Sequence, residues 1–330
     1  MVQRQETALD YFGRKRTFFC EENQRKRKQL EDKFTKVYTH YLNLKAEDIL
    51  PGRYVFNPPA WKKQTVSAHA NASDVARFFR DVLEHQLQQT NNQAYISSLI
   101  SIEDPYSNYQ LWENCMWFKD YQQVVFGQTM INGLMRSYAT AKDIVAHDFS
   151  HALISWTADL EYQGQSGALN ESYADIFAIM FANFPKSDIN KWRWKLGEGF
   201  GKKGGAIRDI SCPSNYGQAE HMNDYRYLLD GESPNEDNDW GWVHHNSGIH
   251  NKVAYYLITS KNPQGHFMFD SKTIAVLFYQ TLIRLRKNSD FTDSYRLLLQ
   301  LGKTLFRADP LKAEKIQTIN NAFAKVGIAV

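Results

Sequence analysis

Apolar residues recur at intervals of three and four along several long stretches of the chain, and they cluster in shorter runs elsewhere. The helical spacing predicts a helix over residues 66–87, whose buried stripe includes Val75, Phe78 and Val82. Beyond residue 155 the same spacing predicts further helices at 167–183, 246–260, 271–287, 291–306 and 313–326. Runs rich in β-branched and aromatic residues predict strands at 94–101 and 121–130.

The first fifty residues carry a weaker pattern. Apolar positions between residues 21 and 44 recur at three and four with charges between them, which predicts a helix. The basic run Arg25–Lys28 is flanked by acidic residues, so we interpret it as a solvated helix face rather than a site for an anionic partner. A connecting segment with three prolines, residues 51–63, follows.

These elements predict an α+β protein with several parts. Residues 1–50 are expected to form an N-terminal helical extension, residues 51–155 a mixed α/β domain, and residues 156–330 a helical C-terminal domain. A chain of 330 residues, with 43% hydrophobic and 14% aromatic residues, is long enough for two domains and a large core.

Composition narrows the class of partner and the compartment. The net charge of +3 is too balanced to argue for nucleic acid, and no apolar run reaches membrane-spanning length. Cys20, Cys115 and Cys212 give neither a CxxC pair nor a disulfide framework, which fits a reducing compartment. The charged first residues contain no apolar core of a Sec-type signal peptide. We therefore expect a cytoplasmic protein that binds neither nucleic acid nor membranes, with its oligomeric state left open.

The strongest chemical signal is a pair of histidines in an apolar setting. On a helix, His147 and His151 project from one face about one turn apart, which suits two nitrogens that hold one metal ion. Twenty residues later, Glu171 and Asp175 are again four apart, so an antiparallel second helix would bring Glu171 to the metal as a third ligand. Asp175 would then lie behind a histidine and fix its tautomer. Two histidines four apart are by themselves more often ordinary surface or core residues, and it is the full pattern that favours a catalytic zinc site.

These residues resemble the active-site helices of the thermolysin-like zinc metallopeptidases, the gluzincins. That family's pattern is HExxH, then about twenty residues, then NExxxD, and this chain reads HDFSH (HDxxH) and NESYAD. The resemblance continues through residues 66–83, 113–117, 206–211, 242–258 and 320–328, and covers roughly the last four-fifths of the chain. It implies a thermolysin-like two-domain fold with a shortened sheet, one zinc ion in a cleft between the domains, and hydrolysis of peptide bonds.

One departure from the family concerns the general base. The resemblance assigns this role to the residue after the first histidine, where this chain has Asp148 instead of glutamate. Both side chains are carboxylates of similar intrinsic pKa, but aspartate is one methylene shorter. Because general-base catalysis depends first on hydrogen-bond reach, a shift of this size can lower the rate about a hundredfold.

Three more residues acquire catalytic roles through the resemblance. His244 matches the family's histidine that donates a hydrogen bond to the tetrahedral intermediate, and Asp239 matches the carboxylate that orients it. Tyr162 corresponds to a second donor to the oxyanion, although a tyrosine in a turn is by default a packing residue.

The resemblance also implies where the substrate backbone binds. The segment Asn114, Cys115, Met116, Trp117 matches an edge strand that pairs with an extended peptide, with the Asn114 side chain on the peptide C-terminal to the cut. Trp117 alone would be interpreted as a packing residue. Arg208 corresponds to an arginine that binds a substrate carbonyl, with a structural ion pair as the alternative.

The family's specificity pocket is apolar and takes the side chain just C-terminal to the cut. Matching positions are Ile144, Leu196 and Ile207, with Phe200 and Tyr138 narrowing the pocket. We therefore expect a preference for apolar or aromatic side chains, and for smaller ones if Phe200 points inward.

Calcium is not expected. Secreted relatives bind calcium beside the active site through several carboxylates, of which Asp143 and Glu198 remain. The other matching positions are Ala182, Arg193 and Lys195, and two cations in place of carboxylates would repel the ion. We expect Asp143 or Glu198 to pair with Arg193 or Lys195 instead.

The sequence supports one leading function and two alternatives. The leading hypothesis is a zinc-dependent endopeptidase or specialised peptide hydrolase. The second is a non-proteolytic zinc enzyme that tailors a small peptide or amide metabolite. The third is a catalytically silent homologue that binds a peptide-like partner.

Overall fold

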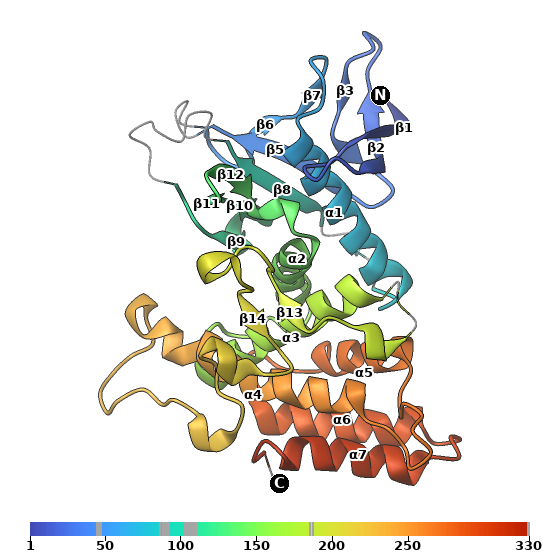
Figure 1. The fold of residues 1–330 in the computed structure, drawn as a ribbon, viewed down its shortest axis with the longest axis vertical. Coiled ribbons are helices and arrows are strands. Elements are labelled where there is room, and N and C mark those ends of the chain that lie inside the picture. The colour runs from blue at the N-terminus through green and yellow to red at the C-terminus, as the bar shows by residue number, and fades with distance from the viewer. Residues whose placement is uncertain are drawn as a thin grey trace. The chain divides into compact units, whose positions relative to one another are not determined.

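The computed structural model describes residues 1–43, 48–85, 87, 93–101, 111–184, 186 and 188–328. The chain divides into two compact units, shown in Figure 1. The first unit comprises Met1–Ala152 and Gly199–Gly205, and the second comprises Leu153–Glu198 and Ala206–Val330. The division falls inside helix α2, Lys142–Trp156.

The first unit contains two main sheets. One has the order β1-β2-β3-β7, with β1 Val2–Leu9, β2 Lys15–Glu22, β3 Lys28–Gln29 and β7 Phe56–Asn57. The other has the order β4-β5-β8-β10-β9, with β6 Arg53–Tyr54 paired to β5. Its strands are β4 Glu31–Asp32, β5 Val37–Leu42, β8 Tyr95–Ile100, β10 Gln123–Phe126 and β9 Cys115–Phe118. Strands β5, β8 and β10 run parallel, and β9 is antiparallel to β10 at the edge.

Helix α1, Lys63–Asp81, packs on β2, β5 and β8 with its apolar face buried. Its Val66 joins a cluster with Phe18 of β2 and with Leu30, which lies between β3 and β4. Its His69 lies in the same layer, with Nδ1 2.9 Å from the Thr39 hydroxyl and Nε2 2.8 Å from the Phe19 carbonyl. The unit also holds a hairpin of β11 Gln128–Ile131 and β12 Leu134–Ser137. Helix α1 and the strand predicted at 94–101 are confirmed. The single strand predicted at 121–130 is wrong, because the chain forms two strands there, β10 and β11, which lie on either side of Gly127 and belong to different sheets.

The predicted N-terminal helical extension is wrong, because residues 21–44 contribute to β2, β3, β4 and β5. Two turns break the helical spacing. Asn23 accepts from the backbone N–H of Arg25 and Arg27, and Asp32 accepts from that of Phe34, which are local bonds that asparagine and aspartate favour in turns. β5 itself, VYTHYL, is rich in the β-branched and aromatic residues that suit strands.

The second unit is mainly helical, and each of its predicted helices is confirmed. They are α3 Gly164–Asn183, α4 Asp239–Thr259, α5 Ser271–Leu282, α6 Phe291–Leu305 and α7 Lys312–Ala324. Helices α3 and α4 pack closely. Gly167 permits this approach, because a Cβ at that position would overlap the Val243 side chain. Figure 1 shows α6 and α7 side by side. A short ladder of β13 Lys195–Leu196 and β14 Arg208–Asp209 completes the unit.

No helix in the described part of the chain combines the length and hydrophobicity that crossing a bilayer requires.

Helix α4 begins with a turn of the opposite hand. Asp239, Trp240, Gly241 and Trp242 have φ of 51°, 51°, 84° and 63°, and the right-handed helix follows from Val243. A left-handed turn destabilises non-glycine residues by about 1–2 kcal/mol each, so the surroundings must hold it. The Trp240 N–H donates to the Asn235 carbonyl at 2.7 Å, and the Gly241 N–H donates to Asn238 Oδ1 at 3.2 Å. The Arg226 guanidinium lies 5.0 Å from the Trp242 ring centroid.

The lowered pKa values of two buried histidines, one in each unit, predict that the stability of the protein depends on pH. Burial lowers the pKa of His69 to about 4 and that of His250 to about 3, so both stay neutral in the folded protein. Unfolded histidine has a pKa of about 6.5. Below that pH the unfolded chain binds protons that the folded units do not. Stability is therefore complete above about pH 6.5, and each histidine removes about 1.4 kcal/mol per pH unit as the pH falls toward its folded pKa.

The measurement is urea unfolding of the zinc-free protein at several pH values between 7 and 5. His69→Gln and His250→Gln should each reduce the pH dependence of the unfolding free energy, while the buried His40 and His85, whose pKa is also lowered to about 4, keep part of it. A wild-type unfolding free energy that stays constant from pH 6.5 to pH 5 would contradict this account.

Candidate active site

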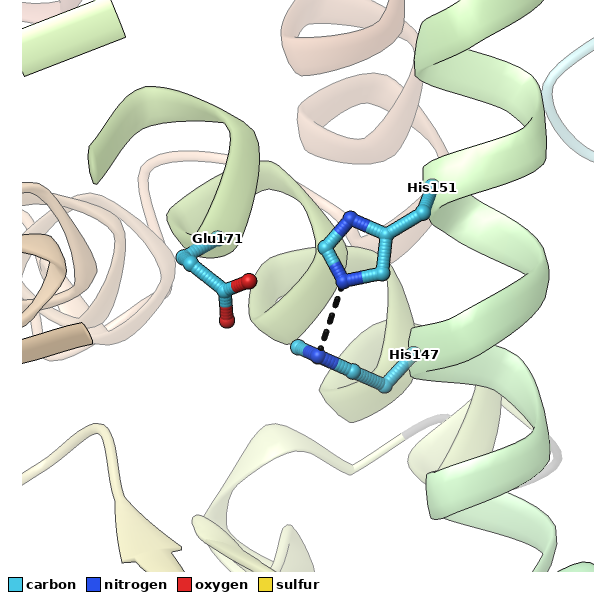
Figure 2. Close-up of side chains that lie close together, drawn as sticks. All are labelled: His147, His151 and Glu171. Atoms are coloured by element: carbon cyan, nitrogen blue, oxygen red, sulfur yellow. Dashed lines mark hydrogen bonds between the residues drawn. The ribbon is translucent and has the colours of Figure 1, made fainter. Parts of the chain in front are cut away.

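The structure brings together the three residues that the sequence predicts as metal ligands. His147 and His151 lie one turn apart on α2, and Glu171 lies on α3. The two Nε2 atoms are 3.1 Å apart, with the rings perpendicular. One ligand atom from each of the three residues lies within 4.8 Å of the others. Figure 2 shows the three side chains turned toward a common point.

This donor set fits zinc. Two nitrogens bound to zinc at 2.0–2.1 Å and at a tetrahedral angle lie about 3.3 Å apart, close to the observed separation. Glu171 is only 1% exposed, and a buried carboxylate requires strong partners or a metal ion. Two imidazoles and one carboxylate form the ligand set of catalytic zinc sites, which keep a fourth position for water or substrate.

Arg208 links Glu171 to Asp175. From β14, its Nη1 donates to Asp175 Oδ1 at 2.6 Å, and its Nη2 lies 3.3 Å from Glu171 Oε2. Burial acts to lower the pKa of Arg208, but the two carboxylates raise it further, so the guanidinium is a permanent cation. The ion pair expected as one alternative for Arg208 is present. Its contact with a substrate carbonyl, and that of Asp175 with a histidine ligand, stay predictions.

Tyr162 and His244 also lie beside Glu171. The Tyr162 hydroxyl donates to Glu171 Oε1 at 2.6 Å, and its oxygen is 3.3 Å from His244 Nε2. His244 Nε2 is 3.4 Å from Glu171 Oε2. Burial and the Glu171 carboxylate raise the pKa of Tyr162 well above its usual range. Its hydroxyl therefore stays protonated and remains a donor.

Asp239 fixes the orientation of His244. Its Oδ1 is 2.6 Å from Nδ1 of the ring, and its Oδ2 accepts from the His244 backbone N–H at 2.9 Å. Burial acts to lower the pKa of His244, but Glu171 and Asp239 outweigh it, so the pKa is raised. With a carboxylate on Nδ1 and oxygen atoms facing Nε2, the surroundings favour an Nε2–H that can donate.

Asp148 lies on α2 directly after His147 and is buried. Its role as a base stays a prediction.

The predicted substrate-binding strand is present as β9. Among the described strands it pairs with β10 alone, and it forms an edge of its sheet. Asn114 precedes it, and the Asn114 Oδ1 accepts from the Cys115 backbone N–H at 2.9 Å. Trp117 lies opposite Val124. An edge strand can accept an extended peptide as a further strand.

The residues predicted for the specificity pocket belong to both units of the chain. In the first unit, Ile144 is buried on α2, and Phe200 stacks on Tyr138 with ring centroids 5.0 Å apart. The Arg136 guanidinium lies 4.2 Å from the Phe200 ring centroid. In the second unit, Leu196 is buried in β13. The Ile207 side chain is exposed on one side and lies next to Gly197 on the other.

Glu198 is paired with Arg193, one of the two cations expected beside it. Arg193 Nη1 lies 3.2 Å from Glu198 Oε2. The Arg193 backbone N–H donates to Asn183 Oδ1 at 2.8 Å, and the Asn183 amide donates back to the Arg193 carbonyl. The backbone that presents the arginine is therefore fixed to α3.

Calcium is expected to leave the thermal stability of the protein unchanged, because Arg193 occupies the neighbourhood of Glu198. The measurement is the melting temperature in calcium, compared with magnesium at the same ionic strength. The double variant Arg193→Asp, Lys195→Glu, which restores carboxylates, should become stabilised by calcium. A calcium-specific rise in the melting temperature of the natural chain would contradict the prediction.

The sequence analysis missed two residues that contact the predicted site. Asn251 donates from Nδ2 to Asp175 Oδ2 at 2.9 Å. The signal was available, because Asn251 lies seven residues after His244 and so shares its helix face. Arg136, which lies on Phe200, carries no such signal in its hairpin.

Comparisons with known proteins agree with this geometry. The sequence profile of the thermolysin metallopeptidase catalytic domain matches residues 5–155, and that of the thermolysin metallopeptidase alpha-helical domain matches residues 158–328. A zinc metalloproteinase of Listeria monocytogenes is 36% identical over 262 residues, which are 78% of this chain and 45% of that protein. A bacillolysin of Brevibacillus brevis is 31% identical over 269 residues, 80% of this chain and 46% of that protein.

The fold has a solved counterpart. The precursor of protealysin, a metalloproteinase from Serratia proteamaculans, superposes with a TM-score of 0.69 at 24% identity, over 89% of this chain and 87% of that one. The chain spans less than half the length of the Listeria and Brevibacillus relatives. Because the two domain profiles together extend from residue 5 to residue 328, the chain belongs to the thermolysin metallopeptidase family.

Proposed function

We propose that the chain is a zinc-dependent peptide-bond hydrolase that acts as an endopeptidase. The observation that carries the proposal is the cluster of His147, His151 and Glu171, with the donors Tyr162 and His244 beside the same carboxylate. The names of the relatives, zinc metalloproteinase and bacillolysin, support the same activity.

The reaction requires a base, and Asp148 is the proposed one. His147, His151 and Glu171 would hold the zinc ion, which when bound would supply a Lewis acid and lower the pKa of water toward neutral. Asp148 takes the proton from the attacking water and later gives it to the leaving amine. Asp148 is buried, and it follows His147 directly on the helix that carries two of the ligands.

His244 and Tyr162 are the proposed donors to the oxyanion. Asp239 holds the His244 ring through Nδ1, so its Nε2–H is oriented before the substrate arrives. A donor oriented in advance stabilises charge that develops only in the transition state, and each one contributes a factor of about 10²–10³ in kcat.

The proposed substrate is an extended peptide that pairs with β9. Asn114, Cys115 and Trp117 would contact its backbone, and Arg208 would bind a carbonyl beyond the cut while keeping its ion pair with Asp175. Ile144 and Ile207 would line an apolar pocket, with Phe200 reducing its size. A preference for apolar side chains just C-terminal to the cut follows.

We also propose that the protein is cytoplasmic. All three cysteines lie in the described part of the chain, and none is disulfide-bonded. Burial raises the pKa of Cys20 to about 12, which keeps that thiol protonated and inert. Detection of the protein in separated cytoplasmic and extracytoplasmic fractions of the cell would test the location.

The test of function is cleavage of an unstructured protein. The protein is stripped with a chelator, reloaded with one equivalent of zinc, and incubated with reduced, carboxymethylated substrate protein, with product ends identified by mass spectrometry. Zinc-dependent internal cuts before apolar residues are expected. Zinc binding without any cut would support the amide-tailoring alternative, and a chain that binds peptide but no zinc would support the silent homologue.

A further inference from the structure

A chain of buried polar side chains crosses the interior of the second unit. Its members come from α3, α4 and α6, and each is 0% exposed: Tyr173, Ser294, His250, Ser172, Asn251 and Asp175. Polar groups in an apolar interior are costly unless each is hydrogen-bonded. The direction of every bond in this chain can therefore be worked out.

The direction is set by the carboxylate at one end. Asp175 Oδ2 accepts from Asn251 Nδ2 at 2.9 Å, so Asn251 Oδ1 faces the other way and accepts from the Ser172 hydroxyl at 2.9 Å. A hydroxyl has a single hydrogen. Because Ser172 has used it, its oxygen must accept from His250 Nδ1, which lies 2.8 Å away.

This result fixes the tautomer of His250. The hydrogen is on Nδ1, and in a neutral ring Nε2 is then an acceptor. The Ser294 hydroxyl, 3.0 Å from Nε2, donates to it, and the Tyr173 hydroxyl, 3.1 Å from Ser294 Oγ, donates in turn. Burial lowers the pKa of His250 to about 3, which agrees with a neutral ring.

Every hydrogen in the chain thus points toward Asp175. Hydrogen bonds aligned in one direction polarise one another and strengthen the last bond of the series. The other oxygen of Asp175 accepts from Arg208 Nη1, and Arg208 Nη2 lies 3.3 Å from Glu171 Oε2. The chain therefore ends next to a metal ligand.

We propose that His250 is a positioning residue for the metal site. Through Ser172 and Asn251 it holds Asp175, and through Arg208 it holds the Glu171 carboxylate in the orientation that binds zinc. The inference rests on the proposed zinc site and concerns the metal affinity of that site.

The test is zinc affinity, measured with zinc alone by competition against a chromogenic chelator. His250→Leu keeps the volume apolar and removes both ring contacts, and it should weaken zinc binding about tenfold or more, as loss of partners behind metal ligands does. Ser172→Ala removes one oxygen atom and should act in the same direction. This smaller change keeps the test available if His250→Leu does not fold.

Rescue and a matched control separate positioning from folding. His250→Asn places an amide near the position of Nδ1, so it can still donate to Ser172 and should recover most of the affinity. His69→Leu in the first unit removes an equally buried histidine with both nitrogens bonded, and it should leave zinc affinity unchanged. Wild-type affinity in His250→Leu, or an equal loss in His69→Leu, would overturn the proposal.

The tautomer gives a second readout that needs neither zinc nor substrate. Nitrogen NMR of the folded protein should show His250 neutral and protonated at Nδ1, and Ser172→Ala should disturb that signal. A ring protonated at Nε2 would reverse the chain and overturn the proposal. A wild-type protein that binds zinc but cuts no peptide would refute the proposed hydrolysis and leave this inference standing.

Discussion

His151→Ala is expected to lower kcat/KM for an unstructured protein substrate by more than about a thousandfold, because zinc lowers the pKa of a bound water from 15.7 to about 7. The variant keeps one imidazole and one carboxylate, one ligand fewer than catalytic zinc sites use, so it should lose zinc during purification. The measurement pairs initial cleavage rates with the zinc content of the same preparation.

The control for this variant is His266→Ala, which removes an exposed histidine outside the cluster. It should keep full zinc content and full activity. Adding excess zinc should not restore the His151 variant to more than a small fraction of the wild-type rate. If His151→Ala binds one equivalent of zinc and cleaves normally, the assigned ligand set is wrong.

Asp148→Glu is expected to raise peptide hydrolysis, by up to about a hundredfold. The longer side chain moves the carboxylate more than an ångström toward the position where a proton must be taken, and its intrinsic pKa is nearly unchanged. The gain should be in kcat, with KM similar, because the base contacts the reacting atoms and not the distant parts of the peptide.

The companion variant Asp148→Asn keeps the size of the side chain and removes the proton acceptor. It should lower kcat by up to about 10², the part of general-base catalysis that the shorter carboxylate retains, while zinc content stays at one equivalent. If Asp148→Glu instead abolishes the native reaction, the short carboxylate serves different chemistry and the amide-tailoring alternative gains support. If Asp148→Asn is as active as the natural chain, Asp148 is not the base.

The part of the site predicted best from the sequence is the metal cluster. His147 and His151 are separated by one helical turn, so their proximity is decided within a single helix. Glu171 follows on the next helix of the chain, so only one short connection had to be inferred. The helices of the second unit were predicted for a similar reason, since their apolar stripes are long enough to show a clear period.

The N-terminal sheets were harder, because β3, β4 and β6 have only two residues each and β5 bonds to β8, far away in the sequence. In β5, Val37, Tyr38, Tyr41 and Leu42 fit a helical spacing as well as a strand. The turns at Asn23 and Asp32 and the β-branched and aromatic composition of the segment distinguish the two. The role of His250 was equally out of reach. It depends on Ser294, which lies 44 residues further along the chain and meets it only in the folded unit.

The reversal of hand before α4 ties two properties of the site to the same pair of atoms. One oxygen of Asp239 holds the His244 ring, and the other accepts from the His244 backbone N–H in the first turn of the right-handed helix. An insertion or deletion between Asp239 and Val243 would move both oxygens of Asp239 away from His244 at the same time. Such a change would fray the helix end and misalign the His244 ring together. The function of the site therefore requires the five-residue spacing between Asp239 and His244.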